Sequence, residues 1–128
     1  MRAFVEIFIS DFTREQLDPL ADLQRLCTDA EMAMRLRRAT DHFPVAGRLG
    51  AVGVPTLVLR ARGDAVHPLE QGLALAAGIP GAEFVQLDSA NHVIPPQEPA
   101  WDALFGAIRR FADLTTAWLS LCGRGSPR

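Results

Sequence analysis

The chain has no long hydrophobic run and no recognisable export signal. The apolar stretch at residues 1–10 is too short to span a bilayer. No small-residue cleavage site separates it from Thr13, Arg14 and Glu15, as a signal peptide would require. The sequence therefore predicts a cytoplasmic protein without a membrane segment.

Cysteine is scarce, and the histidines do not form a ligand pattern. Cys27 and Cys122 are far apart and form no C-x-x-C pair, so neither a disulfide framework nor a zinc site is indicated. Two free thiols suit a reducing cytosol. His42, His67 and His92 have no metal-ligand spacing. We therefore expect no metal and no cofactor.

An excess of charge of either sign is also missing. The net charge is −2 and the pI is near 5.9, so the chain lacks the electrostatic signature of proteins that bind nucleic acid or anionic membranes. With 128 residues, 48% hydrophobic and 22% charged, the composition is typical of one soluble globular domain. A local cluster of arginines among acidic residues predicts a solvated helix face: Arg35, Arg37 and Arg38.

Residues 1–50 have a helical pattern. Phe4, Ile7 and Phe8 are spaced as in a helix, although so short a run also suits a strand. Thr13–Gln16 and Thr28–Glu31 have the form of capping boxes, and the second opens a helix through about Ala39. Leucines at steps of three follow the first box: Leu17, Leu20, Leu23 and Leu26.

Residues 51–114 have a β-α-β-α pattern with parallel strands. Residues 56–60 and 83–87 are short apolar runs of the kind found in buried parallel strands. A helix over 69–77 ends at Gly78, and Pro80-Gly81 forms the turn that follows. A helix over 98–114 carries one apolar stripe: Trp101, Leu104, Phe105, Ile108, Phe111 and Ala112. Residues 115–128 are a tail, in which Trp118, Leu119 and Leu121 could extend that helix.

Asp64 and His92 are the candidate catalytic residues. Each follows a predicted strand, and the carboxyl ends of parallel strands are where ligands bind and catalytic groups gather. An aspartate bound to one imidazole nitrogen fixes the tautomer and leaves the other nitrogen as a general base. Asn91 tolerates left-handed backbone angles, which would suit a tight loop that aims His92. A simple turn at Gly63-Asp64 and an ordinary polar loop at His92 are the alternatives.

These residues carry a resemblance to a known family. The segments Val54–Val66 and Pro80–His92 resemble the end of the α/β-hydrolase superfamily, with its acid after the penultimate strand and its histidine after the last. Gly72 and the run before Pro80 are similar to a bacterial subgroup often fused to LuxR-type regulators or adenylate cyclases, and residues 1–50 resemble its helical cap. The resemblance implies a partial α/β-hydrolase fold of class α/β, with Asp64 as triad acid and His92 as triad base.

The family's nucleophile is absent from this sequence. No serine lies in a G-x-S-x-G elbow, and there is no HGG-type oxyanion loop. Ser89 is three residues from His92, but it lies in the histidine loop rather than on a strand-to-helix turn. The resemblance therefore implies the C-terminal part of a hydrolase for ester-like or amide-like small molecules, inactive alone, whose nucleophile would lie upstream of Met1.

A second hypothesis is a non-catalytic interaction or sensor module derived from a hydrolase, tied to a transcriptional regulator. Two strands make a weak sheet, because parallel strands need neighbours on their edges. We therefore expect a missing part: a complementary hydrolase fragment or a second copy of the chain. An upstream reading frame with G-x-S-x-G would favour the enzyme, and a native start at Met1 would favour the module.

Overall fold

The computed structural model describes residues 6–9, 12–41 and 44–122, without the side chains of residues 118–122. His42 therefore lies outside the described residues. The elements follow the chain in this order: helices α2 (Arg14–Cys27) and α3 (Ala30–Asp41), 3-10 helix η1 (Ala46–Ala51), strand β1 (Leu57–Ala61), helix α4 (Leu69–Gly78), strand β2 (Glu83–Leu87) and helix α5 (Ala100–Cys122). Residues 6–8 are also helical.

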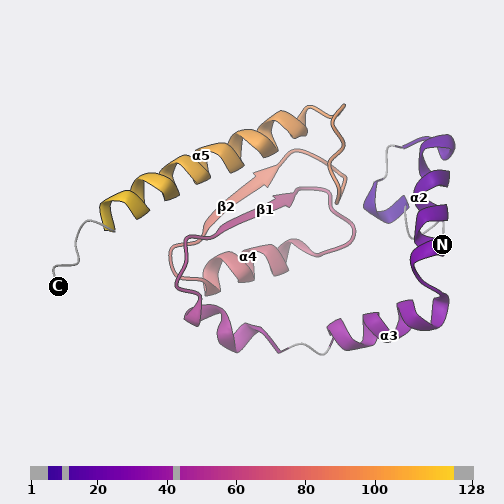
Figure 1. The fold of residues 1–128 in the computed structure, drawn as a ribbon, viewed down its shortest axis with the longest axis horizontal. Coiled ribbons are helices and arrows are strands. Elements are labelled where there is room, and N and C mark those ends of the chain that lie inside the picture. Colours follow the sequence, from indigo (N-terminus) through magenta and orange to yellow (C-terminus); the bar gives the residue numbers. More distant parts are fainter. Residues whose placement is uncertain (1–5, 10–11, 42–43, 123–128) are drawn as a thin grey trace.

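A parallel pair of strands forms the centre of the second part. β1 and β2 pair in the register Leu57↔Glu83 to Ala61↔Leu87, and α4 is the crossover between them. Gly81 has a φ of 72° in the turn before β2, a left-handed conformation that glycine adopts without strain. Figure 1 shows α4 and α5 on opposite sides of the strand pair. The structure thus has helices and a small parallel sheet, compatible with part of an α/β fold.

The core of this part lies between β2 and the start of α5. Leu87, Ile94 and Ala100 are buried together, and Val85, Trp101 and Leu104 pack against them. The predicted apolar stripe of α5 is correct only in part, because Phe105 and Ile108 are more than a third exposed whereas Ala107 is buried. The helix also runs past the predicted end at residue 114, to Cys122. Trp101 and Leu104 of the predicted stripe do pack against the core, whereas the buried Ala100 and Ala107 lie outside that stripe.

Capping side chains begin the two N-terminal helices. The Thr13 N–H donates to Gln16 Oε1 at 2.9 Å, as the first capping box predicts. The second box is wrong by one residue, because Asp29 rather than Thr28 caps α3, accepting from the Met32 N–H at 2.7 Å. An aspartate beside a threonine offers the stronger acceptor, and the helix begins after it.

The helices α2 and α3 have few buried residues and lie apart from the sheet. Leu17 and Ala21 are buried with Phe12 and Leu20 beside them, whereas the last two predicted leucines, Leu23 and Leu26, are exposed. No residue of α3 is buried. Within the described parts, the backbones of α2 and α3 lie apart from the strands and from α4 and α5, and Figure 1 shows these two helices beside that unit.

The surface of α3 carries the predicted arginine cluster. Arg35, Arg37 and Arg38 are all exposed, and Arg37 Nε lies 2.9 Å from Asp41 Oδ1. This agrees with a solvated, charge-paired helix face. Over the residues that the structure covers, no helix has both the length and the apolar character needed to cross a membrane.

Candidate active site at the carboxyl ends of the strands

The loops after β1 and β2 continue side by side beyond the strands. The Arg62 N–H donates to Leu87 O and the Gly63 N–H to Ser89 O, both at 2.8 Å. A Cβ atom on residue 63 would lie 2.9 Å from the Ala90 Cα, closer than real Cβ atoms come to backbone. Glycine at position 63 therefore lets the two loops meet, which brings their catalytic candidates together.

Both oxygens of the Asp64 carboxylate are occupied. Oδ2 lies 2.8 Å from His92 Nδ1. Oδ1 accepts the N–H of Val66 at 2.7 Å and, at 3.4 Å, that of His67. The Asp64 side chain is only 6% exposed, whereas that of His92 is 30% exposed. Asp64 thus lies beneath the imidazole, with its loop wrapped around the carboxylate.

The charge state of Asp64 determines the tautomer of His92. Burial raises the pKa of Asp64, but the hydrogen bonds from His92 and from the Val66 and His67 N–H groups outweigh it, and the net pKa is lowered. Asp64 is therefore ionised at neutral pH, and an ionised carboxylate only accepts hydrogen bonds. Nδ1 of His92 must then donate, which leaves Nε2 as the free, basic nitrogen.

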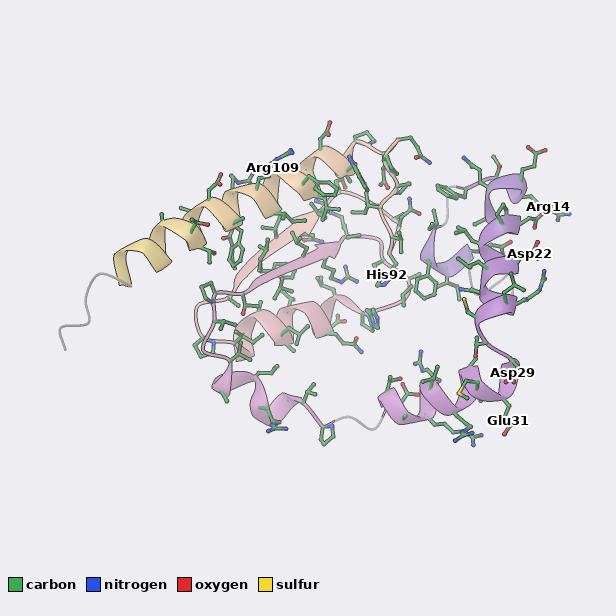
Figure 2. All side chains as sticks on the ribbon, viewed as in Figure 1. Arg14, Asp22, Asp29, Glu31, His92 and Arg109 are labelled. Carbon is green, nitrogen blue, oxygen red and sulfur yellow. The ribbon has the colours of Figure 1, made fainter. Side chains whose placement is uncertain are left out.

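His92 is held from its other side by the N-terminal segment. The Phe8 carbonyl accepts the N–H of His92 at 2.8 Å and that of Val93 at 3.1 Å. The Phe8 ring meets the imidazole edge-on, with centroids 5.1 Å apart, and the His67 ring lies 5.3 Å away. Figure 2 shows His92 beyond the ends of β1 and β2, on the side of residues 6–9. His92 Nε2 has no hydrogen bond with any described residue.

Asn91 has a different role from the predicted one. No non-glycine residue in the described segments has a positive φ, so the expectation of a left-handed Asn91 is wrong. Its side chain is instead buried, at 1% exposure. Its Nδ2 donates to Glu98 Oε2 at 3.0 Å, and its backbone N–H donates to Ser89 Oγ at 2.9 Å. Asn91 thus ties the histidine loop to the residues that precede α5.

The described residues supply no nucleophile at His92. Ser89 is the one serine whose side chain is described, and its hydroxyl accepts from the Asn91 N–H within its own loop. The other serines lie outside the described side chains: Ser10, Ser120 and Ser126. The described part of the chain also holds no cluster of three or more His, Cys, Asp or Glu that could bind a metal ion. The arrangement can orient an imidazole and move a proton.

Three residues at this site were not singled out from the sequence. Glu98 and the Phe8 carbonyl hold the histidine loop, and Arg60 holds the aspartate loop. A charged residue inside an apolar strand was a usable signal for Arg60. The contact of Phe8 is made by its backbone carbonyl, which every residue has, so the residue type could not have predicted it.

The ionisation of Asp64 makes a prediction for stability against pH. Because the pKa of Asp64 is lower in the folded chain than in the unfolded one, its contribution is present above the unfolded pKa and is lost as pH falls through the folded pKa. We expect the difference in free energy of unfolding between the wild type and Asp64→Asn to shrink from about pH 6 to about pH 3. Denaturant unfolding at both pH values measures it.

The matched control is Asp88→Asn, whose carboxylate is exposed and lies 3.8 Å from Arg62. Such a surface pair contributes little, so this variant should match the wild type at both pH values. An Asp64→Asn difference that does not change with pH would contradict the prediction.

The chain matches no family model and no solved structure. It is similar to a protein of Agrobacterium fabrum (strain C58) that carries the provisional name carbamate hydrolase RutD, at 37% identity over 57 residues. That match covers 44% of this chain and 22% of the relative, so the whole relative's activity does not transfer with it. Over this segment the chain is thus similar to a protein named as a hydrolase.

Proposed function

We propose that the chain is the C-terminal part of an α/β-hydrolase-type domain in which Asp64 and His92 are the triad acid and base. The observation that carries this proposal is the 2.8 Å contact between Asp64 Oδ2 and His92 Nδ1, made by a buried carboxylate on a half-buried imidazole. The partial similarity to a carbamate hydrolase supports a hydrolytic reaction. The substrate is a small ester-like or amide-like molecule, a class that includes carbamates.

The chemistry follows from the free nitrogen of the imidazole. His92 Nε2 removes the proton of a hydroxyl nucleophile as that oxygen attacks the substrate carbonyl, and it then returns the proton to the leaving group. Asp64 holds the Nδ1–H and stabilises the imidazolium between these two transfers. The nucleophile and the donors for the oxyanion come from residues outside those that the structure describes.

The open edge of β1 is where we propose that further sheet is added. The hydrogen bonds from Glu83 N–H to Thr56 O and from Arg62 N–H to Leu87 O show which residues at the two ends of β1 face β2. In a parallel pair alternate residues face the neighbour, so Leu57 and Leu59 direct their N–H and C=O groups away from β2. A complementary hydrolase fragment or a second copy of the chain would pair with them.

An ester assay tests whether the described chain is active alone. Acid–base assistance by itself contributes about 10²–10⁴-fold, and without a positioned nucleophile it has little to act on. We expect the purified chain to hydrolyse p-nitrophenyl esters no faster than its His92→Ala variant. A burst of acyl-enzyme that disappears in His92→Ala would contradict this and would point to Ser89, which Ser89→Ala would then check.

The DNA sequence upstream of the Met1 codon discriminates between the enzyme hypothesis and the hypothesis of a non-catalytic module. A reading frame there that continues into this chain and encodes G-x-S-x-G would supply the nucleophile that the proposal requires. A chain that is natively translated from Met1 without such a partner would favour the interaction or sensor module.

A further inference from the structure

Arg60 is a buried arginine near the carboxyl end of β1. It is 9% exposed and follows the half-buried apolar residues Leu57–Leu59. Arginine is almost never buried this far unless it is paired, and a buried charge needs compensating hydrogen bonds. No carboxylate among the described residues forms an ion pair with it. Its partners must therefore be sought among backbone groups.

The guanidinium donates to the backbone of the loop that carries Asp64. Its NH1 donates to the carbonyls of Ala61 at 2.6 Å and Arg62 at 3.1 Å. Its NH2 donates to the carbonyl of His67 at 2.8 Å, and the carbonyl of Asp64 lies at 3.5 Å. The Arg60 side chain thus reaches both ends of the segment 61–67: Ala61, the next residue, and His67, seven positions along the chain.

Two charged side chains of opposite sign hold this loop. The Arg60 guanidinium donates to carbonyls of the loop. The Asp64 carboxylate accepts from the N–H groups of Val66 and His67 in the same loop. Such charge-assisted hydrogen bonds are about twice as strong as neutral ones. The position of Asp64 relative to β1 is therefore determined by Arg60 and not only by the covalent chain.

Space for the Arg60 side chain is provided by Gly72 in α4. A Cβ atom on residue 72 would lie 3.1 Å from Arg60 Cδ and 3.4 Å from Phe84 Cε2, tighter than most real contacts. The stem of Arg60 accordingly lies against the glycine face of α4, and its guanidinium continues to the His67 carbonyl just before that helix. Glycine at position 72 thus leaves the room that the packed Arg60 stem occupies.

From these contacts we infer that Arg60 is a positioning residue, whose guanidinium holds the 61–67 loop so that Asp64 Oδ2 reaches His92 Nδ1. The inference rests on the proposed function, and it assigns a role to a residue outside the triad. Arg60 acts through Asp64, because its NH1 and NH2 groups donate to loop carbonyls, while its buried Nε has no partner among the described residues. Without the guanidinium the carbonyls of Arg62 and His67 lose their donors, and the loop moves to expose them to water.

The test measures the tautomer of His92 in the intact chain by ¹⁵N NMR at about pH 8, above the ordinary histidine range. The wild type should hold His92 in the Nδ1–H form, and Asp64→Asn provides the reference for its loss. We expect Arg60→Met to lower the ratio of the Nδ1–H to the Nε2–H form by about tenfold, or ~1.4 kcal/mol. Arg60→Lys keeps the charge but lacks the planar fork, so it should give an intermediate ratio.

Arg62→Met is the matched control, because the Arg62 side chain is largely exposed and, among the described residues, pairs with Asp88 alone, at 3.8 Å. It should leave the tautomer ratio at the wild-type value. A wild-type ratio in folded Arg60→Met would overturn the inference. If Arg60→Met does not fold, a wild-type ratio in Arg60→Lys would overturn it. An Asp64→Asn variant with a wild-type ratio would instead refute the Asp64–His92 pair and the proposed function with it.

Discussion

The Asp64→Asn variant should hydrolyse esters about 10⁴-fold more slowly than the wild type once the chain is joined to a segment that carries the nucleophile. Asparagine keeps the size of the side chain and can still accept the Val66 N–H, but it carries no charge. The imidazolium formed during the reaction then loses its partner at 2.8 Å. An amide N–H facing Nδ1 also favours the wrong tautomer, so the base is misplaced as well as less basic.

The measurement is kcat/KM for a p-nitrophenyl ester, compared at the same pH for both forms. Asp88→Asn is the charge-matched control, because Asp88 lies on the histidine loop with its side chain 91% exposed. It should leave kcat/KM within about twofold, as exposed charges contribute little. Equal losses in the two variants would show that Asp64 acts through net charge rather than through His92.

The meeting of Asp64 and His92 could be predicted because it depends on local signals and one rule of topology. Apolar runs bounded by turn residues indicate β1 and β2, and the intervening apolar segment ends at a glycine. Parallel strands joined by a helix place both carboxyl ends at one edge. The two loops that follow are then neighbours, whatever the details of their backbone. Their catalytic roles stay predictions.

The rest of the site depends on contacts that residue types do not reveal. The Phe8 carbonyl accepts the N–H of His92, although the two residues are 84 positions apart in the chain, and both groups belong to the backbone. Asn91 was interpreted by its backbone tolerance, whereas its buried amide binds Glu98. The apolar stripe of α5 predicts the packing of Trp101 and Leu104 but not the burial of Ala100 and Ala107, because a pattern based on large hydrophobic side chains gives little weight to alanine.

The edges of the two strands differ in how well they are protected. β2 carries the exposed residues Glu83 and Gln86, and polar side chains discourage strand addition. β1 instead presents Leu57 and Leu59, which are only half-buried. Their outward N–H and C=O groups have no partner among the described residues. We therefore expect another strand to be added at the edge of β1 rather than at that of β2.

We expect the chain to associate in solution through this edge, and a proline at Leu57 to prevent it. The proline removes one outward N–H at the first residue of a strand, where proline is tolerated. Its register partner provides the matched control, since Glu83→Pro removes the bond from Glu83 N to Thr56 O inside the pair. Sedimentation at micromolar concentration should give the wild type a mass above 13.9 kDa. Leu57→Pro should be monomeric with unchanged helix content, whereas Glu83→Pro should lose stability.

A wild-type monomer that melts cooperatively above about 60 °C, at the upper end for mesophile domains, would contradict this expectation. It would show that this sheet needs no added strand and that the chain folds as a unit in its own right.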